Sequence, residues 1–338
     1  MMYINILHSV NRPLFAQQFD VDRFGNSFHF SENSDEDRLW DGVVVFEDFR
    51  QAIQLRCREG GLLFVAGEPP MGSVYAGGFL SQFDVLWMVR PGISTKGEQV
   101  QRQHFNDWHF GYDSAKKEYR YSFDALKQMQ VPEKTKNISV ITSSLAQLPM
   151  HLQRLDFLKA VKKELGDAID FYGRGSNEVT VKADALLDYR FHLCIENVVQ
   201  PDNWTEKLAD PILGYAVPVY IGCTNLSAYF PEDAVVMLDI RDVKGSVAKL
   251  RALLADPEGE YARRLDALKK ARELVLHEYQ LLPSLAAHFE KVIRKHRPVR
   301  ALVIRPNSSF VAWKVKNVFL RLKRFIYKLS YQLVRITK

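Results

Sequence analysis

The charged residues with the most informative spacing lie between residues 189 and 222 of this 338-residue chain. An apolar run, Phe191–Ile195, ends at the polar pair Glu196-Asn197. Thr205-Glu206-Lys207 then begins an apolar-periodic helical pattern, and a second apolar run, Pro218–Ile221, follows that helix. The segment is therefore predicted to be a strand–loop–helix–strand unit whose charges gather at the start of its helix.

The charges at the start of this helix indicate anion chemistry. Glu206 in a first helical turn is favourable against the helix dipole, whereas Lys207 there is mildly unfavourable. A cation at the positive end of a helix suggests an anion nearby, and a diphosphate would supply one. From the spacing alone, ordinary surface charge remains the favoured alternative.

The rest of the chain alternates short strand patterns with helical patterns, which predicts parallel sheets covered by helices on both faces. The predicted strands are Tyr3–Leu7, Val43–Phe46, Leu62–Val65, Val85–Val89, Ile138–Thr142, Ile169–Tyr172, Phe191–Ile195, Pro218–Ile221 and Val235–Leu238. The predicted helices are Phe49–Arg56, His151–Glu164, Thr205–Leu213, Ser246–Leu254, Tyr261–Tyr279 and Leu285–Arg297. Since ligands of such sheets bind at the carboxyl ends of strands, the residues just after each strand are the candidates for a site.

Two sets of strands separate near residues 134–137, so we expect an α/β protein with two Rossmann-like domains. The predicted domains cover residues 1–135 and 136–298. A linker and basic tail are expected over 299–338.

Composition fits a folded protein with a real core, because 47% of the residues are hydrophobic and 25% are charged. The three cysteines, Cys57, Cys194 and Cys223, have neither metal-ligand nor redox spacing, which indicates a reducing compartment. The N-terminus shows no signal-peptide pattern, and no apolar run is long enough to span a bilayer.

The basic balance of the chain is local to its tail. Residues 311–338 hold eight Lys/Arg and no Asp/Glu, and subtracting these charges from the formal net charge of +6 leaves −2 for the remainder. The tail is amphipathic at helical period, with Val318, Leu322 and Ile326 on the apolar face. This predicts a helix on an anionic membrane surface, with docking on the protein or on a partner helix as alternatives. Nucleic acid fits poorly, because the body of the chain is near neutral.

The segment from Tyr189 to Gly222 resembles the donor-binding signature of family 10 glycosyltransferases, the α1,3/α1,4-fucosyltransferases, of bacterial type. Its matching residues are Tyr189-Arg190-Phe191, Leu193, Glu196-Asn197, Thr205-Glu206-Lys207, Ala216-Val217-Pro218-Val219 and Gly222. Weaker likenesses are Ile138–Leu165, Tyr172-Gly173-Arg174-Gly175, Leu62–Val89 and Trp108-His109-Phe110-Gly111. The resemblance implies an inverting glycosyltransferase with a GT-B-like fold, in which the two domains face a central cleft. The domain over 1–135 would then be the acceptor-side domain, and that over 136–298 the nucleotide-sugar donor domain.

The resemblance further implies roles for single residues. Glu68, just after a predicted strand, would be the catalytic base that takes the acceptor hydroxyl proton. Arg154 and Lys207 would bind the donor diphosphate, and Glu206 would accept hydrogen bonds from the ribose hydroxyls. Asn197 would contact the donor sugar or phosphate.

Four further residues are possible donor or acceptor contacts: Glu196, Asn203, Trp204 and His109. Glu196 is equally well interpreted as a buried structural carboxylate. Asn203 and Val198 depart from the family pattern close to the expected donor site.

The function implied is transfer of L-fucose from GDP-fucose to a hydroxyl of a glycan, such as a lipopolysaccharide, O-antigen or related surface oligosaccharide. The alternatives are a transferase of the same fold that uses another nucleotide sugar, and an inactive glycan-binding scaffold. No metal is expected, because the Asp-x-Asp triplets at 20–22 and 35–37 are interpreted as surface acids. The expected location is cytoplasmic, peripheral at the inner face of the cytoplasmic membrane.

Overall fold

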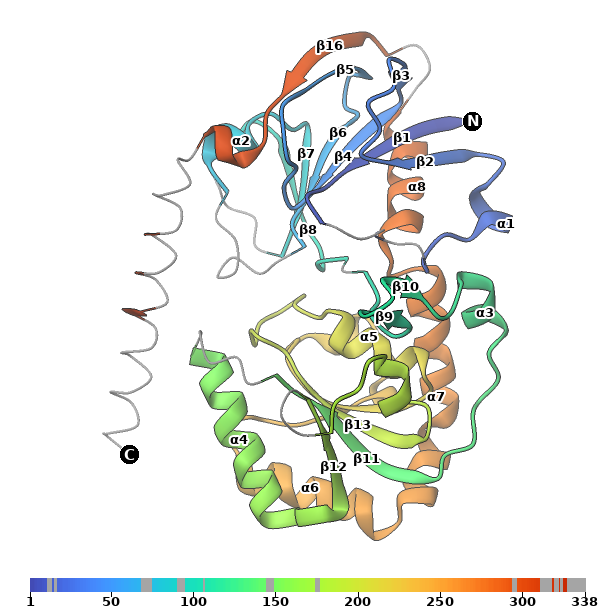
Figure 1. Cartoon of the computed structure of the whole chain (residues 1–338), viewed down its shortest axis with the longest axis vertical. Helices are drawn as coiled ribbons and strands as arrows, with labels where there is room; N and C mark the ends of the chain where they lie inside the picture. The colour runs from blue at the N-terminus through green and yellow to red at the C-terminus, as the bar shows by residue number, and fades with distance from the viewer. Residues whose placement is uncertain are drawn as a thin grey trace. The chain divides into compact units, whose positions relative to one another are not determined.

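The computed structural model describes residues 1–10, 14, 17–67, 75–89, 95–105, 107–143, 149–173, 177–293 and 297–310, with residues 318, 322, 325 and 326 of the tail (Figure 1). The chain forms two compact units. Unit 1 comprises Met1–Asp107 with Tyr279–Arg321, and unit 2 comprises Trp108–Glu278 with Leu322–Lys338.

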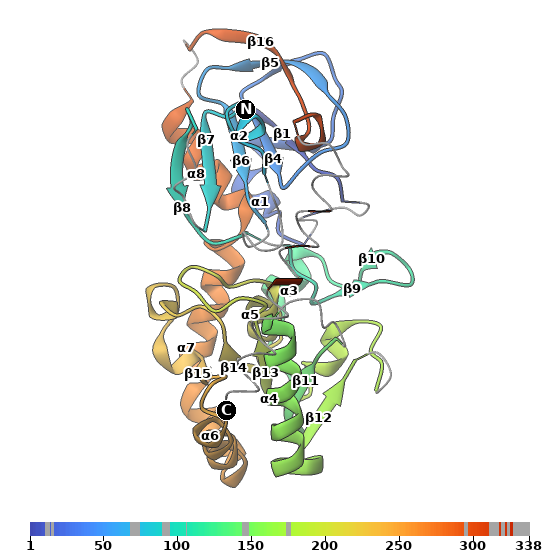
Figure 2. The ribbon, with the colours of Figure 1, turned by 90° about the vertical axis from the view of Figure 1, so that its left-hand side faces the viewer.

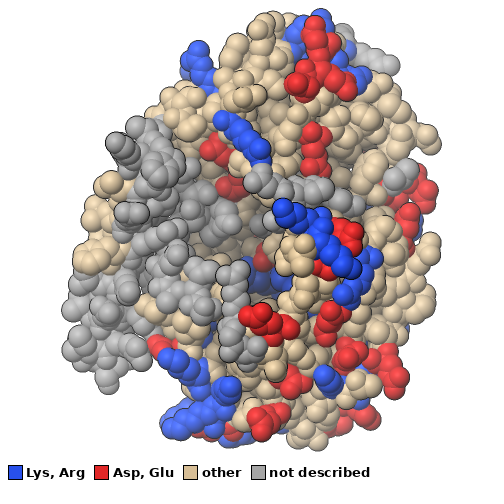
Figure 3. Space-filling view, in the orientation of Figure 1, with Lys and Arg blue, Asp and Glu red and all other residues tan. Residues whose placement is uncertain are grey.

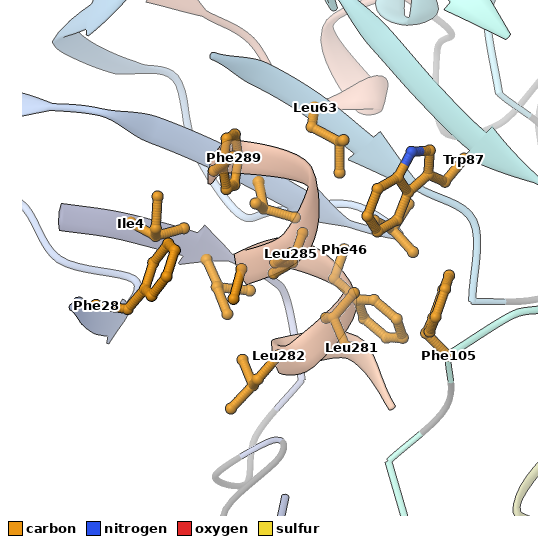
Figure 4. Close-up of a cluster of buried hydrophobic side chains, with 14 of the residues drawn as sticks. Ile4, Phe28, Phe46, Leu63, Trp87, Phe105, Leu281, Leu282, Leu285 and Phe289 are labelled. Atoms are coloured by element: carbon orange, nitrogen blue, oxygen red, sulfur yellow. The ribbon is translucent and has the colours of Figure 1, made fainter. Parts of the chain in front are cut away.

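Unit 1 is built on a six-stranded sheet in which every pairing is parallel. In spatial order its strands are β2 (Phe28–Glu32), β1 (Met2–Leu7), β4 (Gly42–Phe46), β6 (Leu62–Val65), β7 (Val85–Met88) and β8 (Glu98–Gln101). Helix α8 (Leu281–Val292) packs on one face through Leu281, Leu285 and Phe289, which contact Ile4 and its neighbours (Figure 4). The apolar spacing of α8 therefore provides one half of the core of unit 1.

The other face of this sheet has a second core, which the smaller elements of unit 1 cover. These are α2 (Gly77–Leu80) and a three-stranded sheet of β16 (Val299–Ile304), β5 (Ile53–Arg58) and β3 (Leu39–Trp40). Two short elements, α1 (Val21–Phe24) and η5 (Asn307–Ser309), complete the described part of the unit.

The helix predicted over Phe49–Arg56 is wrong, because this region contains strand β5. Leu55 and Cys57 are buried, while Gln54 and Arg56, which alternate with them, are exposed, and this is the period of a strand with one covered face. β5 pairs antiparallel with β16, which lies in the stretch predicted to be a linker. That part of the linker prediction is therefore wrong as well.

The units divide the chain elsewhere than the predicted boundary at residue 135. The division falls between Asp107 and Trp108, and the chain returns to unit 1 at Tyr279. The reason is that the apolar face of α8 is buried against the sheet of unit 1. The predicted boundaries had placed this region in the donor domain. One boundary along the chain cannot describe these two units, because the chain leaves unit 1 and later returns to it.

Unit 2 has a five-stranded parallel sheet. In spatial order its strands are β12 (Ile169–Tyr172), β11 (Lys136–Ile141), β13 (Tyr189–Ile195), β14 (Val217–Ile221) and β15 (Val236–Met237). Its α-helices are α3 (Phe123–Gln128), α4 (Pro149–Leu165), α5 (Glu206–Leu213), α6 (Val243–Ala255) and α7 (Pro257–His277). Short elements are β9 (Tyr112–Asp113), β10 (Glu118–Tyr119), η1 (Gly166–Ala168), η2 (Lys182–Ala185), η3 (Leu226–Ala228) and η4 (Glu232–Ala234).

The strand order of unit 2 reverses between β11 and β13, because the chain moves outward to β12 on one side and to β14 and β15 on the other. Helix α4 contacts α6, and α5 contacts α7 (Figures 1 and 2). The prediction of parallel sheets in two α/β units is confirmed, and every predicted strand is present with ends shifted by at most two residues.

The described residues include no helix that is both long and apolar enough to cross a membrane. The predicted tail helix lies mostly outside the described residues. The side chains of Cys57, Cys194 and Cys223 are buried and unpaired with one another.

Candidate functional site

A hollow with a volume of about 990 Å³ opens in unit 2 where the strand order reverses. Its walls include Ile141, Thr142 and Ser143 at the end of β11, and His192 to Ile195 of β13. Charged side chains from three other elements also line it: Arg154 of α4, Lys182 of η2, and Glu206, Lys207 and Asp210 of α5. A crevice outside the carboxyl ends of strands at a switch point is where open α/β sheets bind ligands.

The end of β13 is tied to the start of α5 through a buried carboxylate. Glu196 has an exposed fraction of 1%. The backbone N–H of Thr205 donates to Glu196 Oε1 at 2.9 Å, and the Thr205 hydroxyl donates to Glu196 Oε2 at 2.9 Å. Thr205 also caps α5, because its Oγ1 accepts the backbone N–H of Lys207 at 3.3 Å. Burial raises the pKa of Glu196, and these donors, together with Lys207, act in the opposite direction.

Five charged side chains form a chain of contacts that alternates in sign, and all of them except Glu196 line the hollow. Lys207 Nζ lies 3.7 Å from Glu196 Oε2 and 3.1 Å from Glu206 Oε1. Lys182 Nζ lies 4.0 Å from Glu206 Oε1 and 2.8 Å from Asp210 Oδ2. Burial alone would raise the pKa of Glu206, but Lys207 and Lys182 outweigh it and hold that pKa well below its usual range. The protein's own carboxylates thus offset the positive charge of Lys207 at the start of α5. At this position the sequence had suggested an external anion.

Arg154 connects α4 to both strand ends at the hollow. Its Nη1 donates to Asn197 Oδ1 at 3.1 Å, and its Nη2 donates to the Ser143 carbonyl oxygen at 3.3 Å and to Ser143 Oγ at 3.2 Å. The side chain is buried, which lowers its pKa, yet an arginine keeps its charge at neutral pH. The guanidinium is therefore held in one orientation before any ligand arrives.

The remaining predicted contacts have other surroundings. Asn203 donates from Nδ2 to the Val198 carbonyl oxygen at 2.8 Å, and Trp204 packs against Phe230 with ring centroids 5.3 Å apart. His109 donates its backbone N–H to Asp210 Oδ1 at 2.9 Å. None of these three is among the described residues that line the hollow. Glu68 lies outside the described residues.

Sequence reasoning missed Lys182, Asp210 and His192. Asp210 has an exposed fraction of 1% within an otherwise apolar helix segment, and a buried carboxylate of this kind requires a partner. That signal was available in the sequence. No signal of this kind marks Lys182, because it lies before β13 in a connection without a motif. Only the folded chain brings it to Asp210.

The arrangement suits a ligand with a strongly anionic part and a polyhydroxyl part. Arg154 and Lys207 supply two cations, and Glu206 beside Lys207 offers carboxylate oxygens to hydroxyl groups. Among the described residues, no three His, Cys, Asp or Glu side chains are grouped so that they could hold a metal ion.

Comparison with known proteins agrees with this chemistry. Residues 131–271 match the model described as glycosyltransferase family 10 (fucosyltransferase) C-term. The 3-galactosyl-N-acetylglucosaminide 4-alpha-L-fucosyltransferase of Bos taurus is 30% identical over 158 residues, which cover 40% of this chain and 43% of that protein. The 4-galactosyl-N-acetylglucosaminide 3-alpha-L-fucosyltransferase of Pongo pygmaeus is 36% identical over 76 residues, which cover 21% of this chain and 21% of that protein. The chain therefore matches less than half the length of either relative.

The fold is also that of a solved structure, an alpha1,3-fucosyltransferase with GDP-fucose. The two share 16% sequence identity and superpose with a TM-score of 0.50 over 88% of this chain and 91% of that chain. The sequence resemblance to family 10 is confirmed over residues 131–271.

The hydrogen bonds between Thr205 and Glu196 predict that two substitutions of Thr205 lower the stability by different amounts. Thr205→Val removes the helix cap and the hydroxyl donor to a buried carboxylate, so we expect the free energy of unfolding to fall by about 2 kcal/mol. Thr205→Ser keeps the hydroxyl and should cost less than about 1 kcal/mol. Urea unfolding followed by circular dichroism measures both values. Equal losses in the two variants would contradict the role given to the hydroxyl.

Proposed function

We propose that this chain, whose residues 131–271 form a glycosyltransferase family 10 carboxy-terminal domain, transfers L-fucose from GDP-fucose to a hydroxyl group of a glycan. The observation that carries the proposal is the hollow at the switch point of unit 2, where Arg154, Lys207 and Glu206 line one continuous surface. The fold shared with an alpha1,3-fucosyltransferase with GDP-fucose supports the choice of donor.

The groups of a sugar nucleotide fit the order of the side chains. Arg154 would attract the diphosphate through the positive charge of its guanidinium, and Lys207 would act on it as a point charge. Glu206, 3.1 Å from Lys207 Nζ, would accept hydrogen bonds from the ribose hydroxyls. Glu196 would not touch the donor, because it is buried beneath Thr205 and fixes the helix that presents Lys207.

Transfer would proceed with inversion at the anomeric carbon. Glu68 takes the proton of the acceptor hydroxyl while the oxygen of that hydroxyl attacks C1 of the sugar. The bond between C1 and the phosphate oxygen breaks, and its electron pair leaves with GDP. Arg154 and Lys207 stabilise the negative charge that grows on the departing diphosphate. Protein cations in this position make a metal ion unnecessary for the proposed reaction.

The acceptor is proposed to be a bacterial surface glycan, of the lipopolysaccharide or O-antigen type, built at the inner face of the cytoplasmic membrane. The tail would hold the enzyme there. Three residues assigned to its apolar face, Val318, Leu322 and Ile326, are 55–65% exposed. Figure 3 shows acidic and basic side chains interspersed over the described surface of this face. This view therefore does not support a broad cationic surface that would bind nucleic acid.

The donor assignment predicts a preference among nucleotides. Calorimetric titration should give tighter binding for GDP than for UDP, and transfer assays should release GDP from GDP-fucose. Arg154→Met removes a buried cation facing the diphosphate and should weaken GDP binding by about 10- to 100-fold. Arg251→Met is the matched control, since Arg251 lies on α6 in an exposed pair with Glu164. Tighter binding of UDP by the wild type would remove the donor assignment.

The catalytic base has its own test. Glu68→Gln keeps the shape of the side chain but cannot take a proton, so kcat should fall by about 10²- to 10⁴-fold while KM for GDP-fucose stays within about twofold. Glu59→Gln, an exposed change in the same unit, should leave kcat unaltered. An unchanged kcat in Glu68→Gln would exclude this glutamate as the base.

The tail predicts charge-dependent membrane binding. The full chain should sediment with vesicles that contain anionic lipid, and binding should weaken as salt is raised. A chain that ends before residue 311 lacks eight cations and should stay in solution under the same conditions. Equal sedimentation of the two chains would refute the anchor.

A further inference from the structure

One polar side chain of the hollow has no role in the mechanism above. His192 is the fourth residue of β13, has an exposed fraction of 5%, and lines the hollow beside Lys182 and Asp210. A buried imidazole at a pocket wall either packs as part of the core or receives a ligand. Its hydrogen bonds distinguish these roles.

A neighbouring serine fixes the tautomer of His192. The Ser139 hydroxyl donates its only proton to the Ala185 carbonyl oxygen at 2.6 Å. The same oxygen lies 2.8 Å from His192 Nδ1, and having given its proton away it must accept there. Nδ1 therefore carries the ring proton, and Nε2 has a free lone pair.

Nε2 is left for a ligand. Among the residues that the structure describes, none donates a hydrogen bond to this atom, although the ring is more than nine-tenths buried. Burial, assisted by the charge of Lys182, lowers the pKa of His192 to about 3, so the ring stays neutral at physiological pH. The hollow thus contains a fixed, uncharged acceptor on β13, four residues before Glu196 in the sequence.

The polar groups that line the hollow together with His192 match one kind of nucleobase edge. Lys182 Nζ is a donor, and its partner Asp210, at 2.8 Å, is a second acceptor that lines the same wall. Guanine presents two adjacent donors, N1–H and the N2 amino group, next to one acceptor, O6. Two acceptors and one donor on the protein complement that edge, whereas uracil presents a single ring N–H between two carbonyl oxygens.

The order of these groups agrees with the order of the parts of a nucleotide. Contacts of 3.1, 4.0 and 2.8 Å connect Lys207 to Glu206, Glu206 to Lys182, and Lys182 to Asp210 in that order. Phosphate, ribose and base follow one another in the same order in a nucleoside diphosphate.

We propose that His192 is a specificity-determining residue that reads the base of the donor, with Nε2 accepting a hydrogen bond from the N1–H and N2 amino edge of guanine. This inference rests on the proposed function, because it takes the diphosphate to lie at Arg154 and Lys207. Ser139 is then a positioning residue that holds the imidazole in the accepting tautomer.

The experiment compares a ligand with a base and a ligand without one. His192→Phe keeps a ring but removes the acceptor, so the Kd of the full chain for GDP should rise by about tenfold or more, while the Kd for inorganic pyrophosphate stays within about twofold. His277→Phe, on α7 and outside the described lining residues, is the control and should change neither value. Equal weakening of both ligands, or no change in either, would overturn the inference.

A second measurement needs no variant to fold. In wild-type protein with ¹⁵N-labelled histidine, the Nε2 signal of His192 should be of the unprotonated type and should shift on adding GDP but not pyrophosphate. A protonated Nε2, or the same response to both ligands, would refute the proposal. Failure of the proposed function has a different signature, since the wild type itself would then prefer UDP to GDP.

Discussion

The site of unit 2 depends on one buried carboxylate. Glu196 ends β13, and its oxygens accept both the amide and the hydroxyl of Thr205, the residue that caps α5. A carboxylate removed from water is costly unless hydrogen bonds and a cation compensate it, and here Thr205 and Lys207 supply both. The strand end and the helix start are thereby fixed to each other. Lys207 and Glu206, the next two residues of the chain, then have defined positions.

The charges that alternate in sign beside the Thr205–Glu196 hydrogen bonds stabilise the folded chain and also suit an incoming ligand. Two lysines placed among three carboxylates need no bound anion to be stable, since each Nζ has carboxylate oxygens within 4.0 Å. Arg154, oriented by Asn197 and Ser143, adds a third cation to the lining of the hollow. The hollow is thus organised before the donor arrives, which lowers the cost of ordering side chains on binding.

Much of this arrangement could be predicted from the sequence, for a physical reason. The strand ending at Ile195, the capped helix at Thr205 and the following strand are local patterns of apolar period and helix start, and the structure has them at the predicted positions. Arg154 was predicted to bind the diphosphate and Asn197 to contact the donor sugar or phosphate, with no contact between them, and the fold brings the two side chains to 3.1 Å. The helix assigned to Phe49–Arg56 was wrong because the alternation of Ile53, Leu55 and Cys57 indicates a strand.

The remaining features depend on tertiary placement that no local pattern encodes. Lys182 reaches Asp210 across 28 positions of sequence, and Ser139 meets His192 across 53. Likewise, α8 belongs to unit 1 because of the sheet it covers, not because of its place in the chain.

The most direct measurement is a crystal structure of the full chain with GDP bound. The account predicts diphosphate oxygens within hydrogen-bond distance of the Arg154 guanidinium and of Lys207 Nζ, with the ribose hydroxyls on Glu206. A diphosphate bound elsewhere on unit 2, with Lys207 still paired only to Glu196 and Glu206, would contradict it.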